Sequence, residues 1–365
     1  MDRRRFVAGG AAAGAAVAAV AAPALAQTAP RIRWRCPGSF PKSLDALWGT
    51  HEHICRRVSE ITDGAFQIQP FAPGEVVPAL QVLDAAGSGS VEIGWTAPYY
   101  YTGKDPSLAL GSCIPFGLNA RQQFAWWHDG GGKDLMAPVF ADQGVRCILG
   151  GNTGAQMGGW FRKEIKSVED LRGLKFRIAG LAGDVLQKLG VIAQQLGGPD
   201  IYPALERGVI DGAEWVGPYD DEKLGFQRVA QYYYFPGWWE PGPSIVMLVN
   251  QRAWEGLPPQ YKAALETACG EGYSFMTGRY DALNPPAMRR LIASGTQLRQ
   301  WPRDVIAACY RATQELYAEI GARNARFKEI HAQWDRFRLD QQTWFRVVED
   351  SFANSMAVAQ AQQPR

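Results

Sequence analysis

Hydrophobic and polar residues alternate in short runs along the chain, and between these runs apolar residues recur every three or four positions. The run RIRWRC (31–36) alternates like a strand, and the apolar positions from Leu44 to Ile61 have helical spacing. A second helix is predicted over 78–86. Further strands are predicted in FQIQPF, VEIGWTA, VRCILGG, GWFRK and LKFRIAG. This order indicates an α/β protein whose sheets are mainly covered on both faces.

The length of 365 residues exceeds the usual size of one hydrophobic core and favours two lobes. A late strand-like run, SIVMLVN (244–250), indicates that the chain returns to its first sheet, and successive helices are predicted from Pro258 onward. We expect lobe I to comprise 27–152 with 243–280 and lobe II to comprise 153–242 with 281–340. Ligands of such proteins bind where the connections diverge, which here is the cleft between the lobes.

The N-terminus has the composition of an export signal. Three arginines at 3–5 precede an uncharged run rich in Ala, Gly and Val that ends in A-L-A at 24–26, which is typical of cleavage after Ala26. Consecutive arginines favour the twin-arginine route, but Asp2 stands where that motif usually has Ser or Thr, so the general secretory route stays open. The sequence therefore predicts a signal peptide over 1–26 and a periplasmic protein.

The net charge, the apolar runs and the cysteine spacing bear on which kinds of protein are possible. The formal net charge of +2 comes from the leader, so the remaining chain is near neutral, has no basic cluster and is not expected to bind nucleic acid. No later apolar run is long enough to span a bilayer. The six cysteines are scattered without a C-x-x-C pair, and most are expected to be buried thiols.

Stretches that look like nucleotide-binding, metal-binding or hydrolase motifs do not match those motifs at the required positions. HDGGGKD (128–134) is preceded by Trp127 where a phosphate loop needs its first glycine, and GSGSVE (87–92) ends in Glu where a dinucleotide-binding turn needs its third. His51 and His53 lie two apart in a helical pattern and so point to different faces. No G-x-S-x-G occurs, and hydrolase chemistry is not supported.

A candidate site comes from separated turns that contain one arginine and two glutamates. Arg177 lies near the end of a predicted strand, where its guanidinium could grip a carboxylate with two parallel hydrogen bonds; the alternative is a surface arginine. Glu214 follows a predicted short strand, and Glu240 follows the ring-rich run YYYFPGWW (232–239). Two neighbouring carboxylates without a cation would force one to stay protonated, and a metal ion would remove that conflict.

Oxygen atoms suited to a hard cation are available in the same turns. The side-chain amide of Gln156 and the backbone carbonyl of Trp215 could complete an all-oxygen set with Glu214 and Glu240. As a spacing pattern this is weak, because the same residue types are ordinary in pockets and cores.

Six stretches together resemble the substrate-binding proteins of tripartite ATP-independent periplasmic (TRAP) transporters, in particular the branch that binds 2-oxo acids. The similarity covers essentially the whole chain after the leader. It is carried by SFPKSLD (39–45), YYYTGKDP (99–106), GGNTGAQMGGWFR (150–162), GLKFRIAG (173–180), DIYPALERGVIDGAEWVGPYDDEKLGF (200–226) and YYYFPGWWE (232–240). The resemblance implies an α/β, two-lobed periplasmic binding protein fold with the ligand cleft between the lobes and a helical C-terminal region.

The resemblance also implies a function without catalysis, in which a small monocarboxylate is captured and delivered to the membrane subunits of a secondary transporter. It implies that Arg177 grips the ligand carboxylate and that Tyr100 contacts the ligand through its hydroxyl. Gln156, Asn152 and Phe40 complete the expected substrate-binding set. A metal ion is expected to bridge ligand and protein through Gln156, Glu214, the Trp215 carbonyl and Glu240.

Two features bear on the ligand and the metal. Ala155 stands where some lactate-binding relatives have an extra polar contact, which favours a 2-oxo acid such as pyruvate over a hydroxy acid. The resemblance implies Na⁺, whereas Ca²⁺ would neutralise the charge of two glutamates, Arg177 and a ligand carboxylate, so calcium stays the alternative. One rival function is the binding of lactate or another hydroxy acid with calcium. The other is a metal-dependent enzyme acting on 2-oxo acids, which would also need a general base.

The C-terminal segment 341–365 has an apolar stripe, because Phe345, Val348, Phe352 and Met356 recur at spacings of three and four. The stripe could pack on its own lobe or reach a second copy. The resemblance favours a homodimer, since similar 2-oxo-acid binders exchange a C-terminal helix.

Overall fold

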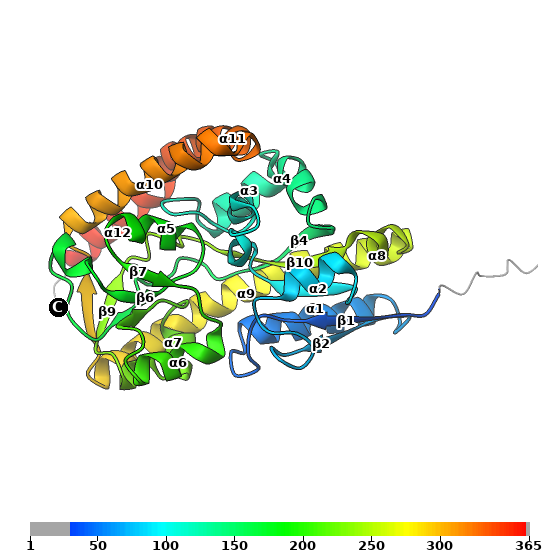
Figure 1. Ribbon diagram of the computed structural model, residues 1–365, viewed down its shortest axis with the longest axis horizontal. Coiled ribbons are helices and arrows are strands. Elements are labelled where there is room, and N and C mark those ends of the chain that lie inside the picture. Colours follow the sequence, from blue (N-terminus) through cyan, green and yellow to red (C-terminus); the bar gives the residue numbers. More distant parts are fainter. Residues whose placement is uncertain (1–29, 363–365) are drawn as a thin grey trace, which may run out of the picture.

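The computed structural model describes residues 30–362, so the predicted signal peptide (1–26) lies outside the described residues. The strands form two groups, which are the centres of two lobes (Figure 1). The α/β class predicted from the sequence is confirmed. The late strand over 244–250 is also confirmed and lies between two strands of the first group.

Lobe I contains two small sheets joined by a single bridge between Gly38 and Trp95. One sheet is the parallel pair β1 (Ile32–Pro37) and β2 (Phe66–Phe71); in the other, β10 (Ser244–Asn250) pairs antiparallel with β3 (Ile93–Thr96) and β4 (Val145–Asn152). The helices of this part are α1 (Leu47–Ile61), α2 (Val82–Ser88), α3 (Ala120–His128), α4 (Gly132–Ala141) and α8 (Gln251–Glu255), with 3₁₀ turns η1 (Pro98–Tyr101) and η2 (Pro106–Gly111).

Lobe II contains one mixed sheet of six strands. Their order is β11 (Gln297–Gln300), β9 (Tyr232–Phe235), β5 (Trp160–Phe161), β8 (Gly212–Ala213), β6 (Lys175–Arg177) and β7 (Ile192–Gln194). The accompanying helices are α5 (Leu181–Lys188), α6 (Gly198–Glu206) and α7 (Pro218–Leu224), with 3₁₀ turns η3 (Val168–Leu171) and η4 (Phe226–Arg228). Strand β11 interrupts the region after Pro258 that the sequence assigns to helices alone.

The C-terminal third is otherwise helical: α9 (Pro259–Ala293), α10 (Arg303–Arg323), α11 (Ala325–Phe345), the π-helical turn η5 (Arg346–Asp350) and α12 (Ser351–Ala361). Helix α9 has 35 residues, which corresponds to about 50 Å. It packs against α1 and β4 of lobe I and against α7 of lobe II, and Figure 1 shows it crossing the middle of the molecule toward the lower left. The lobes are therefore linked by this helix and by the two connections β4 to β5 and β9 to β10.

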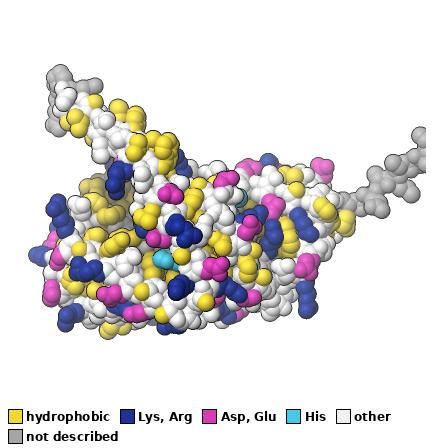
Figure 2. Space-filling view, turned by 90° about the horizontal axis from the view of Figure 1, so that it is seen from above, with side chains coloured by type: hydrophobic (Ala, Val, Ile, Leu, Met, Phe, Trp, Pro, Cys, Tyr) yellow, Lys and Arg dark blue, Asp and Glu magenta, His cyan; other side chains and the backbone are white. Residues whose placement is uncertain are grey.

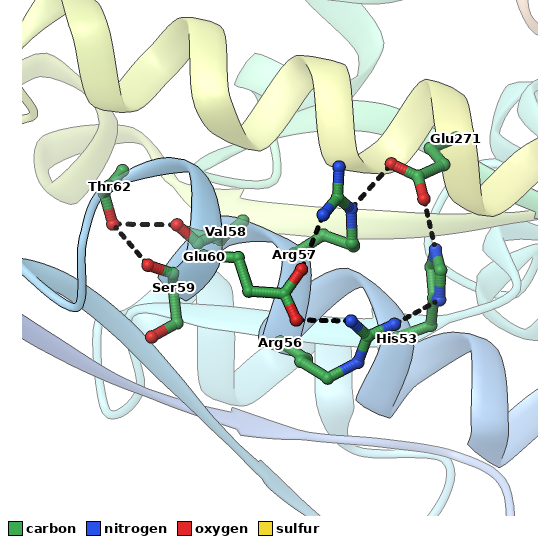
Figure 3. Close-up of polar contacts among 8 residues, drawn as sticks. All are labelled: His53, Arg56, Arg57, Val58, Ser59, Glu60, Thr62 and Glu271. Carbon is green, nitrogen blue, oxygen red and sulfur yellow. Dashed lines mark hydrogen bonds and ion pairs between the residues drawn. The ribbon is translucent and has the colours of Figure 1, made fainter.

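Helix α1 forms because its apolar positions fall on one face, and this face is buried in the core of lobe I. Its polar face meets α9 through an ion-pair network at Glu271 (Figure 3). The Glu271 carboxylate accepts a hydrogen bond from Nε of Arg57 at 2.8 Å and contacts Nε2 of His53 at 3.0 Å. His51, in contrast, is fully buried, so the two histidines do face different surroundings as predicted.

The structure also tests the predictions for the cysteines, for the helix over 78–86 and for membrane-spanning segments. All six cysteines are buried. The helix predicted over 78–86 is shorter and later, at Val82–Ser88. Within residues 30–362 no helix is both long and apolar enough to cross a membrane.

The C-terminal stripe does not pack along its whole length on its own lobe. Phe345 and Val348 are partly buried, but Phe352 is 67% exposed and Met356 is 42% exposed. Helix α12 projects from the body, and Figure 2 shows hydrophobic side chains along this projection. Packing on the same lobe is therefore wrong as an account of the second half of the stripe.

Candidate functional site

The first element of the site is an arginine buried at the end of a strand. Arg177 ends β6, next to β8, and its side chain is 2% exposed. Its Nε donates to the carbonyl oxygen of Leu196 at 3.1 Å, and its Nη1 donates to the carbonyl oxygen of Glu214 at 2.9 Å and also to the Glu214 carboxylate. Within residues 30–362, Nη2 donates none of the hydrogen bonds found for this guanidinium. Arg177 is thus a fixed cation with one nitrogen left for another acceptor.

Glu214 follows β8, which places it beside Arg177 on the neighbouring strand. Its Oε1 also accepts a hydrogen bond from the backbone N–H of Ala179 at 3.1 Å. Burial raises the pKa of Glu214 to about 7, although the Arg177 charge and the Ala179 N–H favour its ionised form. A buried carboxylate is acceptable here because it is paired and hydrogen-bonded.

Glu240 and Gln156 come from the two connections between the lobes and are held together by their backbones. The N–H of Gln156 donates to the carbonyl oxygen of Glu240 at 3.1 Å, and Nε2 of Gln156 donates to the Thr153 hydroxyl at 3.1 Å. Both side chains are buried, yet Oε1 of Gln156 and Oε2 of Glu240 have no hydrogen-bond partner in the described part of the chain. Burial, and then the charge of Glu214, raise the pKa of Glu240 well above its usual range.

Aromatic rings from both lobes enclose these polar groups. Phe40 of lobe I lies edge-on to Trp215 of lobe II, with ring centroids 6.4 Å apart, and Tyr100 lies 6.3 Å from Phe40. The indole of Trp215 covers the guanidinium of Arg177 at 5.1 Å. These rings exclude water from the charges, which strengthens their interactions.

The structure brings together seven of the eight predicted site residues: Arg177, Glu214, Trp215, Glu240, Gln156, Phe40 and Tyr100. The hydrogen bonds of the Asn152 side chain go to other residues. Its amide nitrogen donates to the carbonyl oxygen of Gly242 and to the Tyr273 hydroxyl, both at 2.9 Å, and its amide oxygen accepts from the N–H of Gly154 at 2.8 Å. Its hydrogen bonds brace a connection between the lobes.

Sequence reasoning missed Tyr99 and Thr153, which support Glu240 and Gln156. Thr153 holds the Gln156 amide, and the Tyr99 hydroxyl favours the ionised form of Glu240. Both lie inside stretches that carry the family resemblance, directly beside the predicted residues Tyr100 and Asn152. Their place next to predicted site residues could have indicated them.

The donor set fits a hard cation. The two acceptor atoms without partners are oxygens, and the Trp215 carbonyl and the Glu214 carboxylate are oxygens of the same site. The set has only two acidic side chains, and the described residues contain no cluster of three His, Cys, Asp or Glu side chains. Any ion held here would therefore depend on amide, carbonyl and ligand oxygens as well.

A comparison with known families decides the class of the protein. The family model for bacterial extracellular solute-binding proteins, family 7 (DctP), matches residues 38–324. The chain belongs to this family. Its members are binding proteins of TRAP transporters, so the rival hypothesis of a metal-dependent enzyme is set aside.

Individual family 7 relatives are similar over most of their length. The chain is 50% identical over 331 residues, 91% of each protein, to a monocarboxylate 2-oxoacid-binding periplasmic protein of Nostoc sp.. A TRAP solute-binding protein of Bordetella bronchiseptica is 49% identical, with a TM-score of 0.90 over 91% of this chain and 100% of the other. It is a mixed-occupancy dimer with calcium and picolinate in one site and an apo second site.

Two further family 7 structures contain pyruvate. The protein of Pseudoalteromonas atlantica, with sodium and pyruvate, has a TM-score of 0.87, and the protein of Colwellia psychrerythraea, with calcium and pyruvate, has a TM-score of 0.86. Each is 34% identical and covers 89% of this chain and 99% of its own. These similarities confirm the two-lobed periplasmic binding protein fold with its helical C-terminal region.

Proposed function

We propose that this protein captures a small 2-oxo monocarboxylate, of the size of pyruvate, between its lobes and delivers it to the membrane subunits of a TRAP transporter. One observation carries the proposal: within residues 30–362, a buried guanidinium shares a site with two buried oxygen acceptors that have no hydrogen-bond partner, and rings from both lobes surround it. The site thus offers a cation for a carboxylate and oxygens for a metal. The 2-oxo-acid binding of the Nostoc relative supports the same ligand class.

Arg177 would bind the ligand carboxylate. Its Nε and Nη1 are held by the Leu196 and Glu214 carbonyl oxygens, so the guanidinium is oriented before the ligand arrives. A charge-assisted hydrogen bond from a preorganised donor loses little conformational entropy on binding. The Tyr100 ring lies near Arg177, and its hydroxyl would supply a second contact.

Gln156, Glu214, Glu240 and the Trp215 carbonyl would hold the cation. A bound ion supplies positive charge that keeps both glutamates ionised and attracts the oxygens of a 2-oxo acid. We propose Na⁺ as the ion, because the Ala179 N–H and Arg177 already stabilise the Glu214 charge. Ca²⁺ is the alternative, and related proteins bind pyruvate with either ion.

The proposal extends to assembly and location. Residues of α12 that are exposed in the single chain, including Phe352 and Met356, would be covered in a homodimer, and the Bordetella relative is a dimer. We propose that the signal over 1–26 exports the protein to the periplasm. The lobe boundaries expected from the sequence, near residues 152, 243 and 280, are part of the same proposal.

Thermal denaturation with a panel of small mono- and dicarboxylates tests the proposal. Pyruvate and its longer 2-oxo homologues should raise the melting temperature in sodium, because a ligand that binds only the folded state stabilises it by mass action. Lactate and malate should raise it less. A shift caused by dicarboxylates alone, or equal shifts for lactate and pyruvate, would contradict the proposed ligand class.

A further inference from the structure

Asp45 connects a segment of lobe I with α7 of lobe II and with α9. Its Oδ2 accepts a hydrogen bond from the Tyr219 hydroxyl at 2.9 Å. Its carboxylate also forms ion pairs with Lys223 and Arg279. One carboxylate thus receives three donors from two other elements.

The two segments that meet at Asp45 also carry aromatic rings of the candidate site. Asp45 lies five residues after Phe40, in the segment between β1 and α1 of lobe I. Tyr219 lies four residues after Trp215, in α7 of lobe II. The Phe40 ring meets the Trp215 ring edge-on at 6.4 Å, so the two segments touch at the ligand site and again at Asp45.

One partner of Asp45, Tyr219, is also held by a contact that does not involve Asp45. The backbone N–H of Tyr219 donates to Oδ1 of Asn284 on α9 at 3.0 Å, which fixes the start of α7. Burial and the nearby Arg279 charge lower the pKa of Lys223. Lys223 and Arg279 therefore place two positive charges side by side, and the Asp45 carboxylate pairs with both of them.

Each ion pair at Asp45 contributes only a small free energy, which is compatible with a closure that can be reversed. The side chains of Asp45, Lys223 and Arg279 are 39%, 28% and 35% exposed, so solvent screens each pair and its contribution is small. Small contributions that exist only in the closed form still shift the balance between open and closed forms.

We infer that Asp45 is a positioning residue, which holds the Phe40 segment against the Trp215 segment and so slows release of the ligand without touching it. The choice of pyruvate as the ligand rests on the proposed function. The role of Asp45 in holding the two segments together does not. Its signature is a change in the dissociation rate with little change in the association rate, because the contact forms after the ligand has entered.

The test compares wild type with Asp45→Asn and Tyr219→Phe. Pyruvate in sodium buffer is the probe, and stopped-flow tryptophan fluorescence gives both rate constants. Asp45→Asn should dissociate about threefold to tenfold faster. Tyr219→Phe removes only one hydroxyl and should act in the same direction to a smaller extent. Small-angle scattering should give a larger radius of gyration for Asp45→Asn than for wild type.

Glu222→Gln is the matched control, because Glu222 on α7 pairs with Arg290 on α9 and does not contact the Phe40 segment. Its rates and radius should equal those of wild type. Equal dissociation rates and equal radii for wild type and Asp45→Asn would overturn the inference. If wild type fails to bind pyruvate while the radii still differ, the proposed ligand is wrong and the role of Asp45 in closure stands.

Discussion

Arg177 and Glu214 form a fully buried ion pair between neighbouring strands, in which Nη1 of the arginine reaches both the backbone carbonyl and the carboxylate of the glutamate. The arginine is therefore already neutralised in part when a ligand arrives. In the proposed complex a ligand carboxylate would add a second negative charge to this pair, and an ionised Glu240 would add a third. The proposal of a cation rests on these buried charges rather than on a preformed metal cage.

Replacing Arg177 with methionine should abolish detectable pyruvate binding, a loss of at least about 100-fold, because the ligand carboxylate loses its charged partner. The variant should also lose about 3–5 kcal/mol of stability, since Glu214 is left buried without a cation. Titration calorimetry and urea denaturation measure the two effects. Arg172→Met, at an exposed position of the same region, is the control, and wild-type affinity in Arg177→Met would refute the assignment.

Replacing Glu240 with glutamine should weaken pyruvate binding about tenfold or more at low sodium, because the cation loses one of its charged ligands. Higher sodium should partly restore the affinity. The measurement is the pyruvate dissociation constant as a function of sodium, with choline keeping the ionic strength constant, and then in calcium. Glu169→Gln on the surface serves as the control. Wild-type binding that is indifferent to chelators and to choline would rule out the metal.

The ligand-free protein should lose stability as the pH rises from about 4 to 7. Burial raises the pKa of Asp220 to about 7, above the value of about 3.9 for an unfolded aspartate, so the folded state binds more protons in this window. Each such group contributes a slope of about 1.4 kcal/mol per pH unit. Asp220→Asn keeps the hydrogen bond from the Tyr280 hydroxyl and should flatten the slope. Urea denaturation at pH 4.5, 6 and 7.5 measures it, and an unchanged slope would contradict the prediction.

Removing residues 351–365 should convert a dimer to a monomer while leaving ligand binding unchanged. The truncation deletes α12, whose described residues are all exposed, and keeps the contact between Arg121 and Glu349 that ties η5 to α3. Light scattering at micromolar protein distinguishes the two states. A monomeric full-length protein would refute the dimer, and a truncated protein that stays dimeric would show that another surface holds the copies together.

Local patterns predicted much of the fold. Alternation located β1, and a strand-like apolar run located β10. The position of Glu214 after a short strand was predicted from the helix, glycine and strand that precede it. These features depend on neighbours in sequence. Strand β11 was missed, because its four residues lie between two long helices and become a strand only by pairing with β9.

The sequence predicted most of the residues that lie in the candidate site, but it did not predict which of them contact one another. Arg177 and Glu214 were expected to face a ligand and a metal, and the structure pairs them with each other, a contact between residues 37 positions apart. Asn152 is a polar residue in a turn of the site, which made it a candidate, but its partners Gly242 and Tyr273 lie far along the chain. Such partners are set by the tertiary structure.

Helix α9 is a long helix that packs against elements of both lobes. A helix of this length is stiff, and it is shared by both lobes, but Pro285 and Pro286 within it have no backbone N–H to donate. The carbonyl oxygens one turn earlier therefore lack their usual partners, and bending there costs less than elsewhere along the helix. Helix α7 contacts α9 on both sides of this turn, because the Tyr280 hydroxyl donates to Asp220 and Arg290 pairs with Glu222, so lobe II braces the long helix at the point where its own hydrogen bonding is interrupted.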